Sequence, residues 1–281
     1  LSSANMRLDS KNEKKLSSVT IMKHFKLLNL IFNKACAWKY LAKNPCDAVS
    51  RDLLIKAEST HYPIWDSETL RKAMKIIEGM PHNLSNQKNR LMFYIALTTG
   101  ARKGEFLGLS WDRVDLERRE LKITEAMKYV NGRKPFLGTP KTDASVRTLY
   151  FDDFLKQLFL EYKALLDEWL NKNRITNPQN LVFISRNANE QNEAVPVNGD
   201  SFYLWLKRLC KKHNLPRIAV HSLRAMAATN ALISGMSLNM VQAMLGHTNI
   251  STTSIYLRDV QDERKKVTNL LSKHFADLRK E

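Results

Sequence analysis

The segment "NRLMFYIALTTGARKGEFLGLSW" at residues 89–111 constrains the fold of this chain more than any other stretch. Its apolar run predicts a helix that is buried inside a globular domain. The Thr99-Gly100 pair is expected to end this helix, and a second helix is expected to start near Lys103. This break exposes Arg102 at a helix entry. A chain of 281 residues is long enough for one or two such domains.

A second strong helical pattern lies near the start of the chain. Ser17 can cap a helix whose apolar residues recur at steps of three and four, which predicts one buried stripe. The stripe consists of Ile21, Phe25, Leu28, Phe32 and Ala35. A charged stretch follows, so we expect a domain boundary near residues 55–62, with one domain over 1–58 and another over 62–281.

Strand patterns are confined to the middle of the chain. "ELKITEAMKYV" at 120–130 and "VRTLYF" at 146–151 alternate, and the turn-rich segment between them carries Lys141. They predict a hairpin or small sheet with Lys141 near its turn, and "LVFIS" at 181–185 could be another strand. The expected fold is mainly α with a small antiparallel β-sheet, an α+β fold. Further helices are expected over residues 68–80, 153–170, 200–215, 221–236, 237–247 and 263–280.

The charge of the chain favours nucleic acid as its partner. Lysine and arginine number 45 against 28 aspartate and glutamate, which gives a formal net charge of +17. A ribosome-associated or merely soluble basic protein would share this charge, so charge alone leaves the partner open.

The remaining composition bounds the cellular context. The three cysteines, Cys36, Cys46 and Cys210, are widely spaced in apolar contexts and predict neither disulfides nor a zinc site, which fits a reducing intracellular compartment. No apolar run long enough for a membrane span and no signal-peptide pattern is visible, so a soluble protein is expected. The chain begins without methionine, and we expect a fragment that lacks an N-terminal portion.

A lone tyrosine, Tyr256, follows a helical segment that is rich in polar groups. Most tyrosines pack with a satisfied hydroxyl, but a phenol is also a usable nucleophile when its surroundings activate it. Attack on a phosphodiester builds negative charge, which the planar forks of Arg102 and Arg224 could hold. His221 precedes Arg224 by three residues on the same helical face.

Each of these polar residues has an ordinary explanation as well. Arg102 could form a routine helix-surface ion pair with Glu105, three residues later. His221 and Arg224 could serve surface or cap chemistry, and Lys141 could be a solvated turn lysine. The order and spacing of the whole set are what distinguish it.

Four segments together resemble a known family. "TTGARKGEFLGLSW", "TPKTDASVRTLYF", "HSLRAMAATN" and "LGHTNISTTSIY" resemble the signature boxes of the tyrosine recombinases, the integrases of phages and mobile elements. The resemblance covers residues 62–260 as a catalytic domain. The segment before residue 58 is similar to the closing helices of the family's helical core-binding domain, whose opening helices are not visible. The motifs look most like those of bacterial mobile-element integrases.

The resemblance implies a role for each matched residue. Tyr256 corresponds to the nucleophile, Arg102 and Arg224 to the phosphate clamp, and His247 to an additional hydrogen-bond donor. His221 and Lys141 correspond to the base-side histidine and the general acid, and Glu105 supports the arginines. The family commonly has histidine directly after the second arginine, where this chain has Ala225, so a buttressing contact is missing there or supplied elsewhere.

The activity implied is site-specific DNA strand exchange through a 3′-phosphotyrosine intermediate, without ATP or metal. The sequence shows no Walker A pattern and no carboxylate metal cluster, in keeping with an enzyme that uses no cofactor. Its partners would be double-stranded attachment sites and three further copies in a tetramer, with the helix at 262–281 docked on a neighbour through Val267, Leu271 and Phe275 or packed on its own domain. Its place would be the bacterial cytoplasm, at the nucleoid.

Two alternatives remain open at this level. A type IB topoisomerase would use the same chemistry to relax supercoils without exchanging products. A DNA-binding regulator could keep the fold without catalysis, although all six catalytic positions are filled. DNA sequence, reaction direction and host are not readable from the chain.

Overall fold

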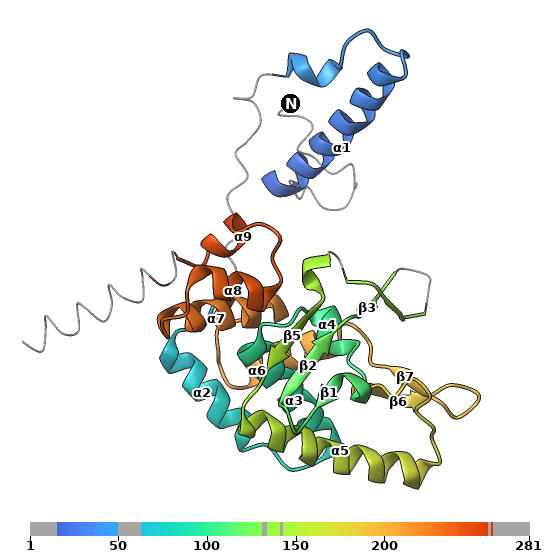
Figure 1. Cartoon of the computed structure of the whole chain (residues 1–281), viewed down its shortest axis with the longest axis vertical. Helices are drawn as coiled ribbons and strands as arrows, with labels where there is room; N and C mark the ends of the chain where they lie inside the picture. Colours follow the sequence, from blue (N-terminus) through green and yellow to red (C-terminus); the bar gives the residue numbers. More distant parts are fainter. Residues whose placement is uncertain (1–15, 50–62, 131–133, 141–142, 258–259, 261–281) are drawn as a thin grey trace, which may run out of the picture. The chain divides into compact units, whose positions relative to one another are not determined.

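The structure is a computed structural model that describes residues 16–49, 63–130, 134–140, 143–257 and 260 (Figure 1). The chain divides into two compact units, Leu1–His61 and Tyr62–Glu281. The described residues are mostly helical with small antiparallel sheets, so the expected fold class is confirmed. Lys141 and the expected helix at 262–281 lie outside the described residues.

The helices account for most of the described chain. The α-helices are α1 (Ser18–Ala37), α2 (Ser67–Glu78), α3 (Leu84–Thr99), α4 (Lys103–Leu107), α5 (Asp153–Asn173), α6 (Ser201–Lys212), α7 (Val220–Ile233), α8 (Leu238–Leu245) and α9 (Ser251–Ser254). The short 3-10 helices are η2 (Pro45–Ala48), η4 (Trp111–Arg113) and η5 (Asp143–Ser145).

The smaller unit is built on α1. Its N-cap is Ser17, whose hydroxyl accepts a hydrogen bond from the Thr20 N–H, as the sequence predicts. The Asn44 side chain, just before η2, donates to the side-chain oxygens of Asn29 and Asn33 on α1, each at 2.7 Å. The predicted buried stripe is only half-buried, and Leu28 is 48% exposed. Among the described elements, the short η2 makes the main packing contact with α1.

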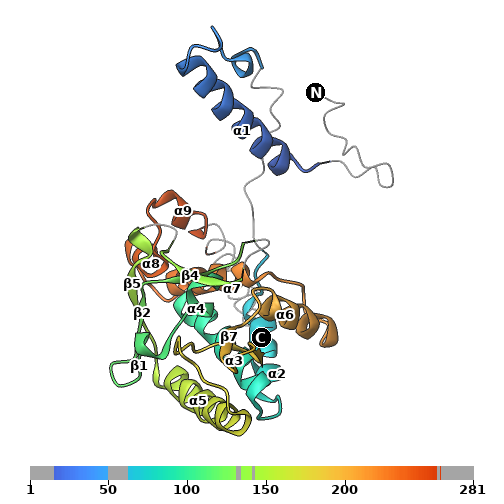
Figure 2. The ribbon, with the colours of Figure 1, turned by 90° about the vertical axis from the view of Figure 1, so that its right-hand side faces the viewer.

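In the larger unit, α3 is the central helix. It packs against both α5 and α7, and every residue from Leu91 to Leu97 is buried. Gly100 ends it with φ +65°, a left-handed conformation that glycine adopts at little cost. In both views, α8 and α9 lie at one end of this unit and α5 at the other (Figures 1 and 2). Because α3 ends at Thr99 and Gly100 follows it, the break predicted at Thr99-Gly100 is correct.

The strands form three small antiparallel sheets. Their order is β1-β2-β5, β3-β4 and β6-β7. Their bounds are β1 (Val114–Asp115), β2 (Glu120–Ile123), β3 (Ala126–Lys128), β4 (Phe136–Gly138), β5 (Arg147–Tyr150), β6 (Ile184–Ala188) and β7 (Ala194–Pro196).

The single strand predicted over residues 120–130 is wrong in detail. It is broken after Ile123 because β2 pairs with β5 whereas β3 pairs with β4, a short strand inside the predicted turn region. The predicted strand at 181–185 is shifted toward the C-terminus, and β6 begins at Ile184. Leu181 to Phe183 lie in the core instead of in a regular strand.

Helices α7 and α8 lie close to the helices predicted over 221–236 and 237–247, and each is followed by a glycine with positive φ. Gly235 follows α7 with φ +93°. Ser237 caps α8, its hydroxyl accepting from the Met240 N–H, and Gly246 ends α8 with φ +64°.

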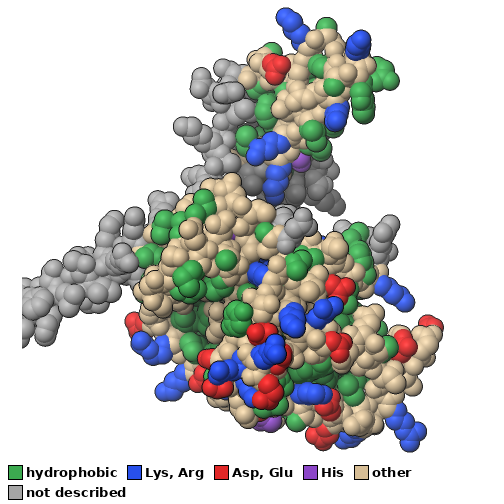
Figure 3. Space-filling model, in the orientation of Figure 1, with side chains coloured by type: hydrophobic (Ala, Val, Ile, Leu, Met, Phe, Trp, Pro, Cys, Tyr) green, Lys and Arg blue, Asp and Glu red, His purple; other side chains and the backbone are tan. Residues whose placement is uncertain are grey.

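The surface of the larger unit carries both signs of charge. On the face seen in Figure 3, acidic and basic side chains are intermixed over this unit, so the excess positive charge is not gathered there. Within the described residues, no helix combines the length and the apolar character that crossing a membrane requires.

Candidate functional site

Arg224 is the most deeply buried charge among the described residues of the larger unit. It lies on α7 with a relative exposure of 1%. Its Nη1 donates to the Gly100 carbonyl at 2.6 Å and its Nη2 to the Leu245 carbonyl at 2.7 Å. Its Nε has no hydrogen-bond partner among the described residues. A buried guanidinium with one unused donor is suited to an anionic ligand.

Arg102 lies beside it, at the break between α3 and α4. Its Nη1 donates to Glu105 Oε1 at 2.8 Å and to the Ser145 hydroxyl at 3.1 Å, and its Nη2 donates to the Gly246 carbonyl at 3.0 Å. Glu105 is buried, whereas the Arg102 side chain is 29% exposed. Arg102 is therefore held by protein on one side and remains accessible on the other.

Glu105 carries more than a surface ion pair. Its Oε2 accepts from the Arg102 backbone N–H at 2.8 Å and from Arg147 Nη2 at 2.9 Å. Burial by itself raises the pKa of this carboxyl, but the hydrogen bond and charge of Arg147, together with the hydrogen bonds of Arg102, outweigh it and lower the pKa below its ordinary value. The routine surface pair considered from the sequence is excluded, because the side chain is 2% exposed.

His247 and Tyr256 lie next to each other where α8 gives way to α9. Their rings are nearly parallel, with centroids 6.5 Å apart. A hydrogen bond of 2.9 Å joins His247 Nδ1 to the hydroxyl of the buried Thr253. Tyr256 is only 3% exposed and belongs to an apolar cluster that includes Leu245 and Ala225.

His221 lines a pocket of about 280 Å³ that Arg102 and Arg224 also line. Lys103 and Asp200 form an ion pair of 3.6 Å among the lining residues. The pocket therefore combines the two arginines and a histidine on one surface, beside the start of α7.

The electrostatics of the cluster reflect its crowded positive charge. Desolvation, followed by the charges of Arg224 and Arg102, lowers the pKa of both His221 and His247 to about 4. Desolvation and the Arg102 charge lower the pKa of Arg224 to about 9. At neutral pH both histidines are thus neutral, while the guanidinium of Arg224 remains protonated.

The structure brings together six of the seven predicted residues. Arg102, Glu105, His221 and Arg224 surround the pocket or support it, and His247 with Tyr256 adjoins them through α8. The seventh, Lys141, cannot be placed because it lies outside the described residues. Ala225, where the resemblance leads one to expect histidine, is 2% exposed in the apolar cluster of Tyr256 and supplies no side-chain hydrogen bond.

Sequence reasoning missed Arg147 and Ser145. Arg147 pairs with Ile123 across the sheet and lies on the same side of β5 as buried Leu149. Strict alternation in "VRTLYF" was the available signal, because it places a charged residue on the face of an apolar core position.

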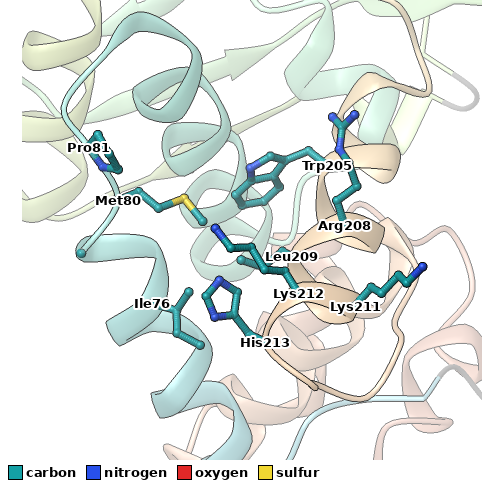
Figure 4. A pocket seen from close by; sticks show the side chains of 10 residues that line it. Ile76, Met80, Pro81, Trp205, Arg208, Leu209, Lys211, Lys212 and His213 are labelled. Atoms are coloured by element: carbon teal, nitrogen blue, oxygen red, sulfur yellow. The ribbon is translucent and has the colours of Figure 1, made fainter.

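A larger pocket of about 650 Å³ lies away from this cluster, between the C-terminal ends of α2 and α6 (Figure 4). Its apolar floor includes Met80, Trp205 and Leu209, and its rim carries Lys211 and Lys212. It contains none of the residues described above. The smaller pocket, which Arg102, His221 and Arg224 line, is therefore the candidate site.

Comparison with known proteins identifies the class. The sequence matches the family model "Phage integrase family" over residues 65–263. This range includes the small sheets and the cluster of arginine, histidine and tyrosine. Residues 4–50 match the "Phage integrase SAM-like domain". Because the first match covers most of the chain, this protein belongs to the phage integrase family, the tyrosine recombinases.

Individual relatives agree with this assignment. A tyrosine recombinase XerC-like protein of Caldanaerobacter subterraneus is 26% identical over 92% of this chain and 67% of its own length. The ICEBs1 integrase of Bacillus subtilis is 25% identical over 91% of this chain and 66% of its own. The transposase of transposon Tn916 from Enterococcus faecalis is 28% identical over 69% and 49%. The chain thus spans about half to two thirds of the length of these relatives.

A solved structure shares the fold. The Tn1549 transposon integrase in complex with transposon right end DNA superposes with a TM-score of 0.69 at 22% identity, covering 89% of this chain and 79% of that one. At this identity the likeness establishes the fold alone.

Proposed function

We propose that this chain is a site-specific DNA recombinase of a mobile element, which cleaves and rejoins DNA through a covalent bond to Tyr256. The observation that carries the proposal is the state of Arg224. Its guanidinium is 1% exposed and is fixed by two carbonyls, and its Nε has no partner among the described residues. Such a guanidinium is prepared to bind a phosphate. The DNA-bound Tn1549 integrase and the relatives from integrative elements support DNA as that ligand.

The first chemical step is an exchange of phosphate ester bonds. The Tyr256 hydroxyl oxygen attacks a DNA phosphorus, and the bond from phosphorus to the 5′ oxygen breaks with its electron pair on that oxygen. The tyrosine proton passes to neutral His221, and Lys141 gives a proton to the departing 5′ oxygen. The products are a 3′-phosphotyrosine and a 5′-hydroxyl. A 5′-hydroxyl from another strand then reverses these transfers and releases Tyr256.

The arginines and His247 stabilise the charge that builds on the phosphate. Arg102 and Arg224 bind its non-bridging oxygens and remain charged at neutral pH. The proposed role of His247 as a donor to phosphate requires its proton on Nε2, so in this proposal the Thr253 hydroxyl is the donor in the 2.9 Å hydrogen bond to Nδ1. Glu105 orients Arg102 through both its backbone and its side chain.

Bound phosphate also improves His221 as a base. The pKa of about 4 applies to the DNA-free site, where two arginines face the ring. A phosphate between these arginines compensates their charge and raises the pKa of His221 toward its ordinary value.

Strand exchange between two duplexes further calls for an assembly. We propose four protomers on two attachment sites, with residues 1–58 and 62–281 both contacting DNA and the segment 262–281 docked on a neighbour. The net charge of +17 supports extended contact with DNA. The cellular place would be the bacterial cytoplasm, where mobile DNA recombines.

The test uses DNA that the chain itself selects. Duplexes enriched from a random pool by binding are labelled at the 5′ end and nicked at successive positions, so that cleavage next to a nick releases a short fragment and traps the adduct. A 3′-phosphotyrosine retains the 5′ label on the protein in denaturing electrophoresis. We expect a labelled protein band with the parent chain and none with Tyr256→Phe.

The same material separates the alternatives. Exchange of labelled arms between two selected duplexes identifies a recombinase, whereas relaxation of a supercoiled plasmid without exchange identifies a topoisomerase. Specific binding without any adduct would identify a regulator and overturn the proposal, as would a failure to enrich any sequence.

A further inference from the structure

Arg147, at the start of β5, uses every nitrogen of its guanidinium for a different segment of the protein. Nε donates to the Met244 carbonyl at 2.7 Å, Nη1 to the Ser145 carbonyl at 2.9 Å and Nη2 to Glu105 Oε2 at 2.9 Å. The side chain is 8% exposed. Three of its five N–H groups are donated to protein and the side chain is largely buried, so we expect its role to act through its partners.

One partner of Arg147 is the C-terminal end of α8, which holds three arginines at once. The carbonyls of Met244, Leu245 and Gly246 accept in turn from Arg147, Arg224 and Arg102. The last carbonyls of a helix lack partners within the helix and form its negative end, so cations are favoured there. Successive carbonyls thereby fix the relative positions of three guanidinium groups.

The other partner, Glu105, links the same arginines from the opposite direction. Its Oε1 accepts from Arg102 Nη1, and its Oε2 accepts from both the Arg102 N–H and Arg147 Nη2. Arg147 therefore closes a ring that runs through Glu105, Arg102, the end of α8 and back to itself. His247 follows this end of α8 directly.

We propose that Arg147 is a positioning residue for strand cleavage, which holds the end of α8 and Glu105 so that Arg102 and Arg224 meet one phosphate in the correct geometry. The inference rests on the proposed function. Arg102 and Arg224 contact the substrate, whereas Arg147 acts on them through Met244 and Glu105. A displacement of about 1 Å in such groups costs about 100-fold in rate.

The ring also controls the charge of Glu105. The charged groups that face this carboxylate are Arg102 before α4, Arg147 on β5 and Arg224 on α7. Without Arg147, burial acts on Glu105 with less compensation, and the pKa of the carboxyl rises. As pH falls, Glu105 in such a variant is protonated at a higher pH than in the parent chain, and Arg102 loses its charged partner at that higher pH.

The experiment compares single-turnover adduct formation, on the selected nicked duplex, by the parent chain and variants of Arg147. For Arg147→Met we expect cleavage about 100-fold slower, DNA affinity within threefold, and an acid limb of the pH–rate profile moved to higher pH. Arg147→Lys keeps a positive charge near Glu105 but cannot reach three acceptors, so its rate should be intermediate and its acid limb should stay in place. Arg119→Met, which removes a surface ion pair to Asp153, is the matched control and should behave like the parent.

A merely structural role would not move the pH profile. In Arg147→Met with Glu105→Gln, the carboxyl is gone, so the shift of the acid limb should disappear while the rate stays low. Arg147→Met that cleaves within threefold of the parent, or the same acid limb in all variants, would overturn the proposal. If Arg147→Met does not fold, Arg147→Lys serves as the test instead. A folded Arg147→Lys variant that cleaves at the parent's rate would also overturn the proposal.

Failure of the proposed function looks different. In that case the parent chain itself forms no adduct on DNA that it binds. The link between Arg147 and Glu105 is then read from the pH dependence of the melting temperature. Arg147→Met should lose stability at a higher pH than the parent, the double variant should not, and parallel curves would contradict the link.

Discussion

At the scale of single residues, the environment of Tyr256 is unusual for a nucleophile. Its side chain is 3% exposed and packs in a cluster with Ala225, Leu245 and Val260. A phosphate therefore reaches the hydroxyl only after the ring leaves this cluster or α9 moves.

His247 gives a prediction about pH and stability. Its folded pKa is about 4, below the ordinary value of 6.5, so the unfolded chain binds more protons between these values. The contribution of neutral His247 is complete above about pH 6.5 and is lost as pH falls toward 4. Between pH 7 and 5 we expect the parent to lose about 2 kcal/mol more unfolding free energy than His247→Gln.

Urea unfolding of DNA-free protein at the two pH values measures this difference. Equal losses in the parent and in His247→Gln would show that the imidazole is not held neutral by its burial and by the charges of Arg224 and Arg102.

At the scale of elements, the end of α8 organises the site. Gly246 has φ +64°, and a Cβ there would lie 2.7 Å from the Ala144 carbonyl and 3.2 Å from Arg147 Cδ. Gly246→Ala should therefore displace the carbonyl that binds Arg102. We expect about 1–2 kcal/mol lower stability from backbone strain and cleavage slowed at least tenfold, measured by thermal unfolding and adduct formation.

Gly235→Ala is the matched control for this substitution. Gly235 also has positive φ, +93°, but a Cβ there meets nothing within 4 Å. It should lower stability without slowing cleavage. Equal slowing by both alanines would mean that general destabilisation, and not the position of the α8 end, limits cleavage.

Some features of these elements could be predicted from the sequence, and others could not. Helix ends at Gly100, Gly235 and Gly246 were predictable because a left-handed cap favours glycine, although α5 ends at Arg174 in the same conformation. The six placed candidate residues followed from their motifs. The break after Ile123, where the chain leaves the sheet of β2 and β5 and enters the sheet of β3 and β4, was not predictable, because strand pairing depends on distant partners. The binding of three arginines to consecutive carbonyls of α8 was equally hidden, because a carbonyl has no signature in the sequence.

At the scale of the whole molecule, net charge governs the encounter with DNA. A formal charge of +17 predicts binding dominated by phosphate contacts and counterion release. Between about 50 and 200 mM salt, affinity for the selected duplex should fall about 1000-fold or more. Fluorescence anisotropy measures it, and Tyr256→Phe should show the same slope because its charge is unchanged. Affinity that barely depends on salt would contradict a phosphate-dominated interface.

The central claim is that Tyr256 bonds covalently to DNA, and mass spectrometry of the trapped adduct tests it most directly. Trypsin should release the peptide 225–258, in which Tyr256 is the only tyrosine. After nuclease digestion, the account predicts this peptide with a 3′-linked nucleotide on Tyr256 and no such mass from Tyr256→Phe. A nucleotide on any other side chain, or an adduct that survives Tyr256→Phe, would contradict it.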